Sequence, residues 1–275
     1  MKQLFLYLHK KHIAMKHLIL SFFFISLTVM VSCTSSGNKT PVTKTAKNDS
    51  IKILKKHFNN NPSSPVEWVI PMKMDKDGKY VRNGVAVRYL KSGKKAEEIP
   101  YVMGKKEGTR LTYHSTGKVY KEQHYVNNKL NGICKRYDRQ GKLTAEYPYK
   151  NGLPGIGLKE YTNLGKLRPD PVISITRKDE IKTSGKYRII VTLTGKGASR
   201  IKSVKFYNGN LLEGKYFHKN LMPARMLSSK KGEFVFELRS GSILNTGLNI
   251  VADARTNTGM RLILQKPVKI SVRGI

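Results

Sequence analysis

The sequence predicts a mainly β protein in which a meander of repeated hairpins is followed by a β-sandwich. Glycine and tyrosine recur with a spacing of about 24 residues through the middle of the chain. Short runs of alternating apolar and polar residues follow the last repeat, and such alternation is typical of half-buried strands. With 39% hydrophobic residues the chain is able to bury a core, and its 2 cysteines are too few for a disulfide scaffold.

The first 33 residues have the features of an export leader. They contain no acidic residue, carry four lysines, and continue into an apolar run over residues 18–31. This run is shorter than the roughly 20 residues that a permanent membrane-spanning helix needs. It ends in Met30-Val31-Ser32-Cys33, and a polar stretch follows. A leader that begins at Met15 has the usual length and composition, so Met1 and Met15 are both candidate translation starts.

Residues 30–33 resemble the lipobox of bacterial lipoproteins, with Met30 standing where leucine is usual. The resemblance implies that residues 1–33 are a lipoprotein signal peptide with its lipobox cysteine, and that Cys33 is acylated and anchors the protein to a membrane. Thr34 is not the aspartate that marks inner-membrane retention. The expected location is therefore the bacterial cell envelope, on the outer membrane facing the periplasm. A plain secretory peptide and an N-terminal membrane anchor are the alternatives.

Residues 34–65 are rich in Ser, Thr, Asn, Lys and Pro. We expect them to form a flexible linker that holds the folded part away from the membrane. Residues 51–58 are the apolar piece of this linker, and they predict a brief helix with Asp49 or Ser50 as its N-cap.

Residues 66–168 contain a repeat of hairpin size. Its first glycines follow one another at intervals of 24, 24 and 23 residues, at Gly84, Gly108, Gly132 and Gly155. A tyrosine comes five or six residues after each of them, and a second glycine with a lysine comes after that tyrosine. The second glycine suits a turn with positive φ, and the flanking segments alternate as strands do, so each unit predicts a β-hairpin.

Stacked hairpins bury their aromatic residues together, because one hairpin alone cannot bury them. We therefore expect the repeat tyrosines to form the core of the meander: Tyr89, Tyr101, Tyr113, Tyr125, Tyr137, Tyr149 and Tyr161. The repeated glutamates are expected to pair with lysines across strands, and an acidic ladder that binds a cation is the alternative. These glutamates are Glu98, Glu122 and Glu146.

The pattern Gly-x4-Tyr-x3-Gly-Lys, followed by Glu and Tyr, resembles the MORN repeat variant, and within it the YwqK-like proteins, over residues 78–168. The resemblance implies a MORN-like stack of hairpins. The chain departs from the family soon after the first glycine, where Ala86-Val87, Arg110-Leu111 and Cys134-Lys135 replace the usual aromatic residue. YwqK-like proteins are often described as antitoxins and are expected in the cytosol, so an exported chain is not expected to share that role.

Residues 169–275 predict a second domain. Pro169 and Pro171 form a stiff boundary after the last repeat. Seven short alternating runs follow, at residues 172–176, 187–193, 201–207, 233–238, 248–254, 260–264 and 268–272. This number of short strands in about 100 residues suits a β-sandwich. Residues 247–254, with a turn and a closing strand after them, resemble the last two strands of bacterial Ig-like domains, which implies an Ig-like β-sandwich.

No constellation of residues indicates catalysis. Acylation of Cys33 leaves Cys134 as the single thiol of the mature chain, and we expect it to be a buried hydrophobic residue. His114 and His124 could share a hairpin, but they have no carboxylate nearby to complete a metal site. Asp75-Lys76-Asp77-Gly78 suits a turn better than a calcium loop. We therefore expect no metal and no cofactor.

Net charge is the largest functional signal in the sequence. The chain has 52 Lys and Arg against 18 Asp and Glu, a formal net charge of +34, and such a surface attracts polyanions. For an exported protein we expect anionic glycan, lipopolysaccharide or envelope proteins as partners, and we expect no nucleic acid, because no nucleic-acid-binding motif is present. A solvated surface without a partner is the alternative.

The lysines after the turn glycines occupy the same place in each hairpin and are candidate anion-binding residues: Lys94, Lys118, Lys142 and Lys166. Protection of the sheet edge against pairing with other chains is the alternative role. Together these observations favour a non-catalytic, lipid-anchored envelope protein that acts as a binding or scaffolding module. An envelope enzyme that acts on glycan, with its site at the junction of repeats and sandwich, is the alternative function. Clustered carboxylates in a concave pocket would favour the enzyme.

Overall fold

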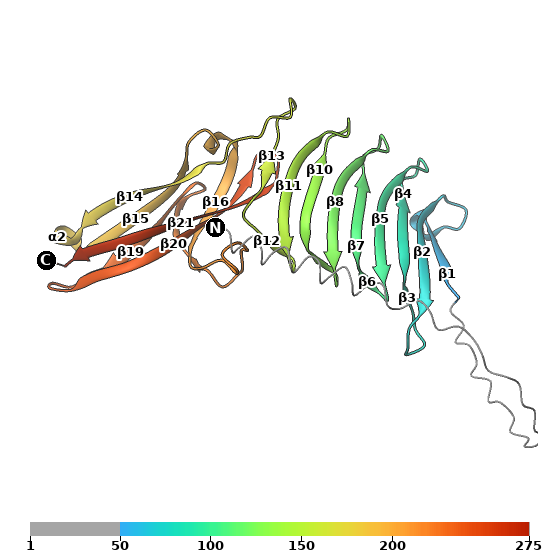
Figure 1. The fold of residues 1–275 in the computed structure, drawn as a ribbon, viewed down its shortest axis with the longest axis horizontal. Coiled ribbons are helices and arrows are strands. Elements are labelled where there is room, and N and C mark those ends of the chain that lie inside the picture. Colours follow the sequence, from blue (N-terminus) through green and yellow to red (C-terminus); the bar gives the residue numbers. More distant parts are fainter. Residues whose placement is uncertain (1–49, 275) are drawn as a thin grey trace, which may run out of the picture. The chain divides into compact units, whose positions relative to one another are not determined.

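The computed structural model describes residues 50–274, all of which belong to one compact unit, Asn48–Ile275. The fold is mainly β, with a 13-stranded antiparallel sheet followed by two four-stranded sheets (Figure 1). The predicted leader, Cys33 and residues 34–49 of the predicted linker lie outside the described residues. Over residues 50–274, no helix is long and apolar enough to cross a membrane.

The large sheet, called the repeat sheet below, is a meander in which neighbouring strands follow chain order. Its long strands lie in the order β1-β2-β4-β5-β7-β8-β10-β11, and the short strands β3, β6, β9, β12 and β13 pair with β2, β5, β8, β11 and β11. The bounds are β1 (Lys52–His57), β2 (Val66–Met74), β3 (Tyr80–Arg82), β4 (Gly84–Tyr89), β5 (Lys95–Val102), β6 (Lys105–Lys106), β7 (Gly108–Tyr113), β8 (Val119–Val126), β9 (Lys129–Leu130), β10 (Gly132–Tyr137), β11 (Leu143–Lys150), β12 (Leu153–Pro154) and β13 (Lys159–Glu160).

The predicted hairpins are present at the predicted positions. The strands β4, β7 and β10 each end at the first tyrosine of a unit, and β5, β8 and β11 each run one residue past the second. In the turns between them, Gly93, Gly117 and Gly141 have φ values of 78°, 89° and 87°, a conformation that favours glycine. The pairing register shifts just before each first tyrosine, as in a β-bulge.

The first glycine of each unit lies directly opposite the second tyrosine. These pairs are Gly84 with Tyr101, Gly108 with Tyr125, and Gly132 with Tyr149. These three glycines have φ values of 109°, 100° and 111°, a conformation that favours glycine, and a Cβ at each would contact Pro71, Pro100 or His124 of the strand on the other side. Backbone conformation and close packing therefore explain why the first glycine recurs.

The predicted helix over residues 51–58 is wrong, because Lys52–His57 forms the edge strand β1 of the repeat sheet. The predicted linker therefore ends earlier than residue 65. Six residues are too few for a stable isolated helix, whereas β2 offers a free edge of backbone donors and acceptors. The pairing of β1 with β2 shifts register between Lys56 and His57, as it does at the end of β4, β7 and β10. The structure thus begins with a hairpin that lacks the glycine and tyrosine of the repeat.

The two smaller sheets have the strand orders β14-β15-β19-β18 and β17-β16-β20-β21. They share one hydrophobic core, to which Ile189, Val191, Phe206, Ile250 and Leu262 contribute fully buried side chains. The elements are β14 (Val172–Glu180), α2 (Ile181–Ser184), β15 (Lys186–Thr194), β16 (Ile201–Asn208), β17 (Met222–Pro223), β18 (Arg225–Ser228), β19 (Lys231–Glu237), β20 (Ile243–Thr256) and β21 (Arg261–Arg273). Short 3-10 turns occur at Phe58–Asn60 and Ala198–Arg200.

The last two predicted runs, residues 260–264 and 268–272, form a single strand, β21, rather than two. Pro267 lies within it, opposite Asn249 of β20. Proline has no backbone donor, but β21 is the edge strand of its sheet, so no neighbouring strand needs that donor.

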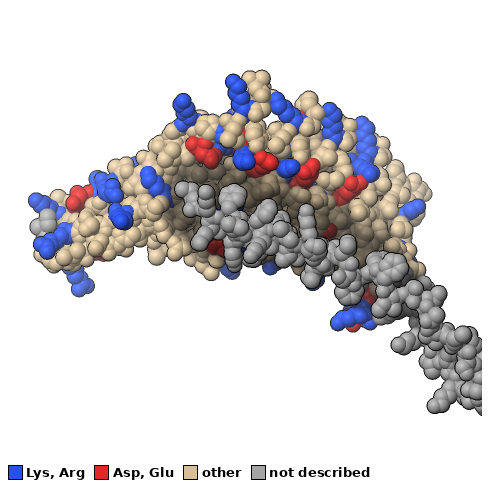
Figure 2. All heavy atoms as spheres, in the orientation of Figure 1, with Lys and Arg blue, Asp and Glu red and all other residues tan. Residues whose placement is uncertain are grey.

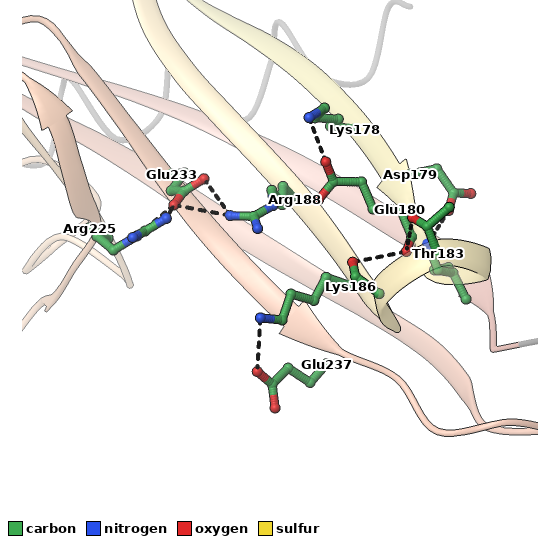
Figure 3. Close-up of polar contacts among 11 residues, drawn as sticks. Lys178, Asp179, Glu180, Thr183, Lys186, Arg188, Arg225, Glu233 and Glu237 are labelled. Atoms are coloured by element: carbon green, nitrogen blue, oxygen red, sulfur yellow. Dashed lines mark hydrogen bonds and ion pairs between the residues drawn. The ribbon is translucent and has the colours of Figure 1, made fainter.

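A buried carboxylate joins three strands of the β14-β15-β19-β18 sheet (Figure 3). Glu233 of β19 is 3% exposed and accepts hydrogen bonds from Arg188 of β15 and from Nε of Arg225 of β18, the latter at 2.6 Å. Arg188 also donates to Glu180 at 2.8 Å. Hydrogen bonds from Lys178 and Arg188 lower the pKa of Glu180. Every charge of this cluster has an opposite partner, so we interpret it as structural.

Candidate functional site

The first tyrosine of each unit donates a hydrogen bond to the glutamate of the preceding unit. The pairs are Tyr113 with Glu98 at 2.7 Å, Tyr137 with Glu122, and Tyr161 with Glu146 at 2.8 Å. Burial, and then the hydrogen bond to Glu122, raises the pKa of Tyr137 to about 12. These contacts, called the tyrosine–glutamate ladder below, join consecutive hairpins.

The expected pairing of the glutamates with lysines is present only in part. Lys159 of β13 lies 3.8 Å from Glu146 of β11, across neighbouring strands as predicted. Lys95 lies 2.5 Å from Glu98, but both residues belong to β5. The hydrogen bond from Lys95, followed by that from Tyr113, lowers the pKa of Glu98. The tyrosine hydroxyl is the partner common to all three glutamates, which the charge pattern of the sequence did not reveal.

The repeat tyrosines are not equally buried. Tyr101 is 5% exposed and packs in a cluster with Ile70, Ala86 and Ile99. The other six lie at intermediate exposure: Tyr89, Tyr113, Tyr125, Tyr137, Tyr149 and Tyr161. The expectation of a uniform tyrosine core is therefore too simple, because the sheet is a single layer between its turns and most rings keep one side towards solvent.

The candidate anion-binding lysines are all exposed, and three of them contact the next turn along the sheet. Lys94 Nζ donates to the Ser115 carbonyl oxygen at 3.1 Å, and Lys118 Nζ donates to that of Gln140 at 2.7 Å. Lys142 Nζ donates to the Asn163 carbonyl oxygen. Lys166, in the last turn, makes no such contact within the described residues. Each ammonium group has three N–H donors, so one carbonyl contact leaves donors for a ligand.

In the space-filling view of Figure 2, Lys and Arg side chains project along the upper edge of the molecule, and Asp and Glu side chains lie beneath them. The upper edge is where Figure 1 places the turns between β4 and β5, β7 and β8, and β10 and β11.

The remaining sequence candidates have local partners. Asp75 Oδ1 accepts hydrogen bonds from the backbone of Asp77 and Lys79, both at 2.9 Å, so this acidic segment is a turn as predicted. His114 and His124 contact the Tyr137 carbonyl oxygen and the Thr109 hydroxyl. Among residues 50–274, no group of three His, Cys, Asp or Glu side chains could hold a metal ion.

Cys134 is completely buried, as expected. Burial raises the pKa of its thiol, and a protonated buried thiol is a poor nucleophile.

The fourth repeat unit, which begins at Gly155, meets the sandwich around a buried carboxylate that the sequence analysis missed. Glu160 of β13 is 2% exposed and accepts hydrogen bonds from Arg200, from Thr256 and from Thr258. Arg200 also pairs with Asp170. Only the folded chain brings these groups together, because Thr256 lies 96 residues from Glu160 in the sequence.

Backbone hydrogen bonds between residues 154–156 and 215–217 add to this contact between the repeat sheet and the sandwich. Phe217 N donates to the Pro154 carbonyl oxygen at 2.9 Å, and Ile156 N donates to that of Lys215 at 3.0 Å. A Cβ at Gly155 would lie 3.0 Å from the Tyr216 ring, so only glycine allows this close approach without a shift. The repeat glycine at this position therefore serves the contact with the sandwich.

Between the third repeat unit and the β20–β21 hairpin lies a pocket of about 380 Å³, called the junction pocket below. None of its described lining residues is acidic. The lining includes four cations and three tyrosines: Lys121, Arg136, Arg255, Arg261, Tyr120, Tyr147 and Tyr149. The junction pocket is therefore cationic and aromatic, an arrangement that suits the binding of an anion.

A comparison with protein families agrees with the repeat geometry. The model of the MORN repeat variant matches residues 106–127 and 130–151. These two segments comprise β7 with β8 and β10 with β11, together with the turns between them. No curated protein and no solved structure gave a match. Two adjacent repeats within residues 106–151 are therefore MORN-type repeats.

Proposed function

We propose that this protein is a non-catalytic, lipid-anchored module of the bacterial cell envelope that binds anionic polymers through its repeat sheet. The observation that carries the proposal is the row of exposed turn lysines, Lys94, Lys118, Lys142 and Lys166. Each unit adds two strands, and neighbouring strands lie about 4.8 Å apart, so these ammonium groups recur at about 10 Å. A repeating polyanion can contact several of them at once, and the net charge of +34 attracts it.

The order of the strands in the smaller sheets supports an Ig-like domain as the second part of this module. Named in chain order from A to G, with β17 as C′, the sheets have the orders A-B-E-D and C′-C-F-G. Immunoglobulin-type sandwiches have this arrangement. We propose that the domain holds the repeat sheet through the contacts of Glu160.

The test of polymer binding uses a variant in which all four turn lysines are replaced by glutamine. Binding to lipopolysaccharide is measured at two salt concentrations. We expect the variant to bind more weakly and to lose part of its salt dependence, because fewer counterions are released. A control with four exposed lysines replaced elsewhere, Lys196, Lys202, Lys219 and Lys230, has the same net charge. Equal binding by the two variants would show that total charge, not the row, binds the polymer.

The proposed anchor has a separate test. Mass spectrometry of the protein from membranes is expected to find an acylated N-terminal Cys33, and an unmodified Cys33 in the wild-type protein would contradict the lipid anchor. Cell fractionation would then show whether the outer membrane, the proposed site, contains the protein.

A further inference from the structure

Two pairs of like-charged residues lie directly opposite one another on neighbouring strands of the junction pocket. Lys121 of β8 is the register partner of Arg136 of β10. Arg255 of β20 is the register partner of Arg261 of β21. Like charges in directly opposite positions destabilise a sheet. Both pairs line the same pocket, so positive charge accumulates there at the expense of stability.

The preceding repeat unit shows how such charge is otherwise balanced. Glu97, which is 24 residues before Lys121, is 7% exposed. Its carboxylate accepts a hydrogen bond from Arg110 Nε at 2.9 Å and lies 3.8 Å from Arg88. The same repeat position holds Lys121 in the second unit and Ala145 in the third. The acid that neutralises the arginines of this face is therefore present in the first unit and absent from the second and third, which line the junction pocket.

Within residues 50–274, three of the four cations of the pocket have no carboxylate partner. Arg261 binds both carboxylate oxygens of Asp253, at 2.7 and 2.9 Å, so its charge is balanced. Arg136 donates to the Thr258 carbonyl oxygen at 2.9 Å and to the Thr144 hydroxyl, both neutral groups. In the described part of the chain, neither Lys121 nor Arg255 has a carboxylate partner.

The tyrosines give the pocket an apolar wall with hydroxyl groups. Tyr147 and Tyr149 stand edge to face with ring centroids 6.0 Å apart. Burial raises the pKa of both side chains, so both hydroxyls are protonated and able to donate at neutral pH. The Lys121 ammonium lies 4.7 Å from the centroid of the Tyr120 ring. This contact orients the ammonium group without neutralising its charge.

We propose that the junction pocket binds a small phosphorylated saccharide, with Lys121, Arg136 and Arg255 contacting its phosphate groups. Guanidinium groups match phosphate with paired hydrogen bonds, and tyrosines offer both a ring face and a hydroxyl to a sugar. A volume of about 380 Å³ lies within the usual range for small-ligand pockets. This inference rests on the proposed binding role and assigns that role a second, discrete site.

The test is calorimetric titration of the full chain in detergent with fructose 1,6-bisphosphate, with fructose and inorganic phosphate as reference probes. We expect the bisphosphate to bind at least about tenfold more tightly than inorganic phosphate, which corresponds to about 1.4 kcal/mol. Fructose alone is expected not to bind. Equal affinity for bisphosphate and inorganic phosphate would overturn the assignment of a saccharide, and absence of binding by both would overturn the site.

The informative variant is Lys121→Glu, which removes one cation and places near Arg136 the acid that Glu97 provides in the preceding unit. We expect it to weaken bisphosphate binding by at least about tenfold and to raise Tm, because a like-charged pair becomes an opposite one. Lys129→Glu, at an exposed position of β9, makes the same change in net charge and should bind as the wild type does.

Three outcomes would overturn the proposal: unchanged binding by Lys121→Glu, an equal loss in Lys129→Glu, or a Tm of Lys121→Glu below that of the wild type. Arg255→Gln, at an exposed position, is a second variant that should weaken binding without affecting the core. All these chains keep the turn lysines, so a failure here is separate from a failure of polymer binding.

Discussion

Replacing Glu160 with alanine tests whether the contact between the repeat sheet and the sandwich depends on a buried charge. The Glu160 side chain is 2% exposed and its partner Arg200 is 10% exposed. Removing one member of a buried ion pair costs about 3–5 kcal/mol, because the remaining charge stays buried without a partner. Asp170, which is 46% exposed, still pairs with Arg200. We therefore expect a loss near the lower limit, about 3 kcal/mol.

For a chain of this size such a loss lowers Tm by about 6–12 °C, which differential scanning calorimetry can measure. The matched control is Glu213→Ala. Glu213 also joins the two parts of the structure, at 2.7 Å from Lys150 Nζ, but it is 59% exposed. An exposed pair of this kind contributes little, so Tm should hardly change. Equal shifts in the two variants would refute the argument from burial, and Glu160→Gln should give an intermediate value.

Three further predictions concern the repeat sheet. Burial, and then the hydrogen bond to glutamate, raises the pKa of Tyr113 and Tyr137, and the hydrogen bond to Glu146 raises that of Tyr161. The protonated tyrosines therefore stabilise the fold fully below the unfolded-state pKa of about 10, and this stabilisation is lost as pH rises through the folded-state values. Chemical denaturation between pH 9 and about 12 should show a steeper loss of stability in the wild type than in a triple Tyr→Phe variant, and parallel curves would argue against the ladder. Lys118→Met should speed amide hydrogen exchange in the turn at residues 138–142, whose Gln140 carbonyl it contacts, while Lys166→Met, which has no further turn to contact, should change no exchange rate. Gly132→Ala, at φ 111°, should cost about 1–3 kcal/mol in backbone strain, whereas Gly247→Ala, at a strand glycine without positive φ, should be neutral or stabilising, and equal melting temperatures would contradict the conformational argument.

The hairpins could be predicted from the sequence because turn chemistry is local. Glycine at a fixed place after a strand-like run determines both the turn and the end of the strand, and β4, β7 and β10 end where the tyrosines predicted. The hairpin of β1 with β2 has neither residue, so its existence depends on the free edge of β2 rather than on a motif. The split of β21 into two predicted strands has a similar cause, since Pro267 reads as a break unless the strand is known to be an edge.

The candidate site was harder to predict from the sequence, because its charged residues come from segments that are far apart in the chain. Lys121, Arg136, Arg255 and Arg261 are ordinary residues in a basic sequence, and only the strand register places them in like-charged pairs. One signal was available in the repeat alignment: the change from Glu97 to Lys121 at the same repeat position. The uneven burial of the tyrosines had no such signal, because the buried Tyr101 occupies the same repeat position as the less buried Tyr125 and Tyr149.

The contacts between units repeat from one hairpin to the next. Lys94, Lys118 and Lys142 each contact the following turn. Tyr113, Tyr137 and Tyr161 each contact the preceding glutamate. Residues 108–131 could therefore be removed, and the flanking hairpins would still present matching ladder and turn partners to one another, although the junction pocket would lose Tyr120 and Lys121. Such a deletion would shorten the sheet by two strands, or about 10 Å. The number of units is thus an adjustable length of the repeat sheet, and gain or loss of whole repeats in evolution could change reach while keeping the contacts between neighbouring hairpins.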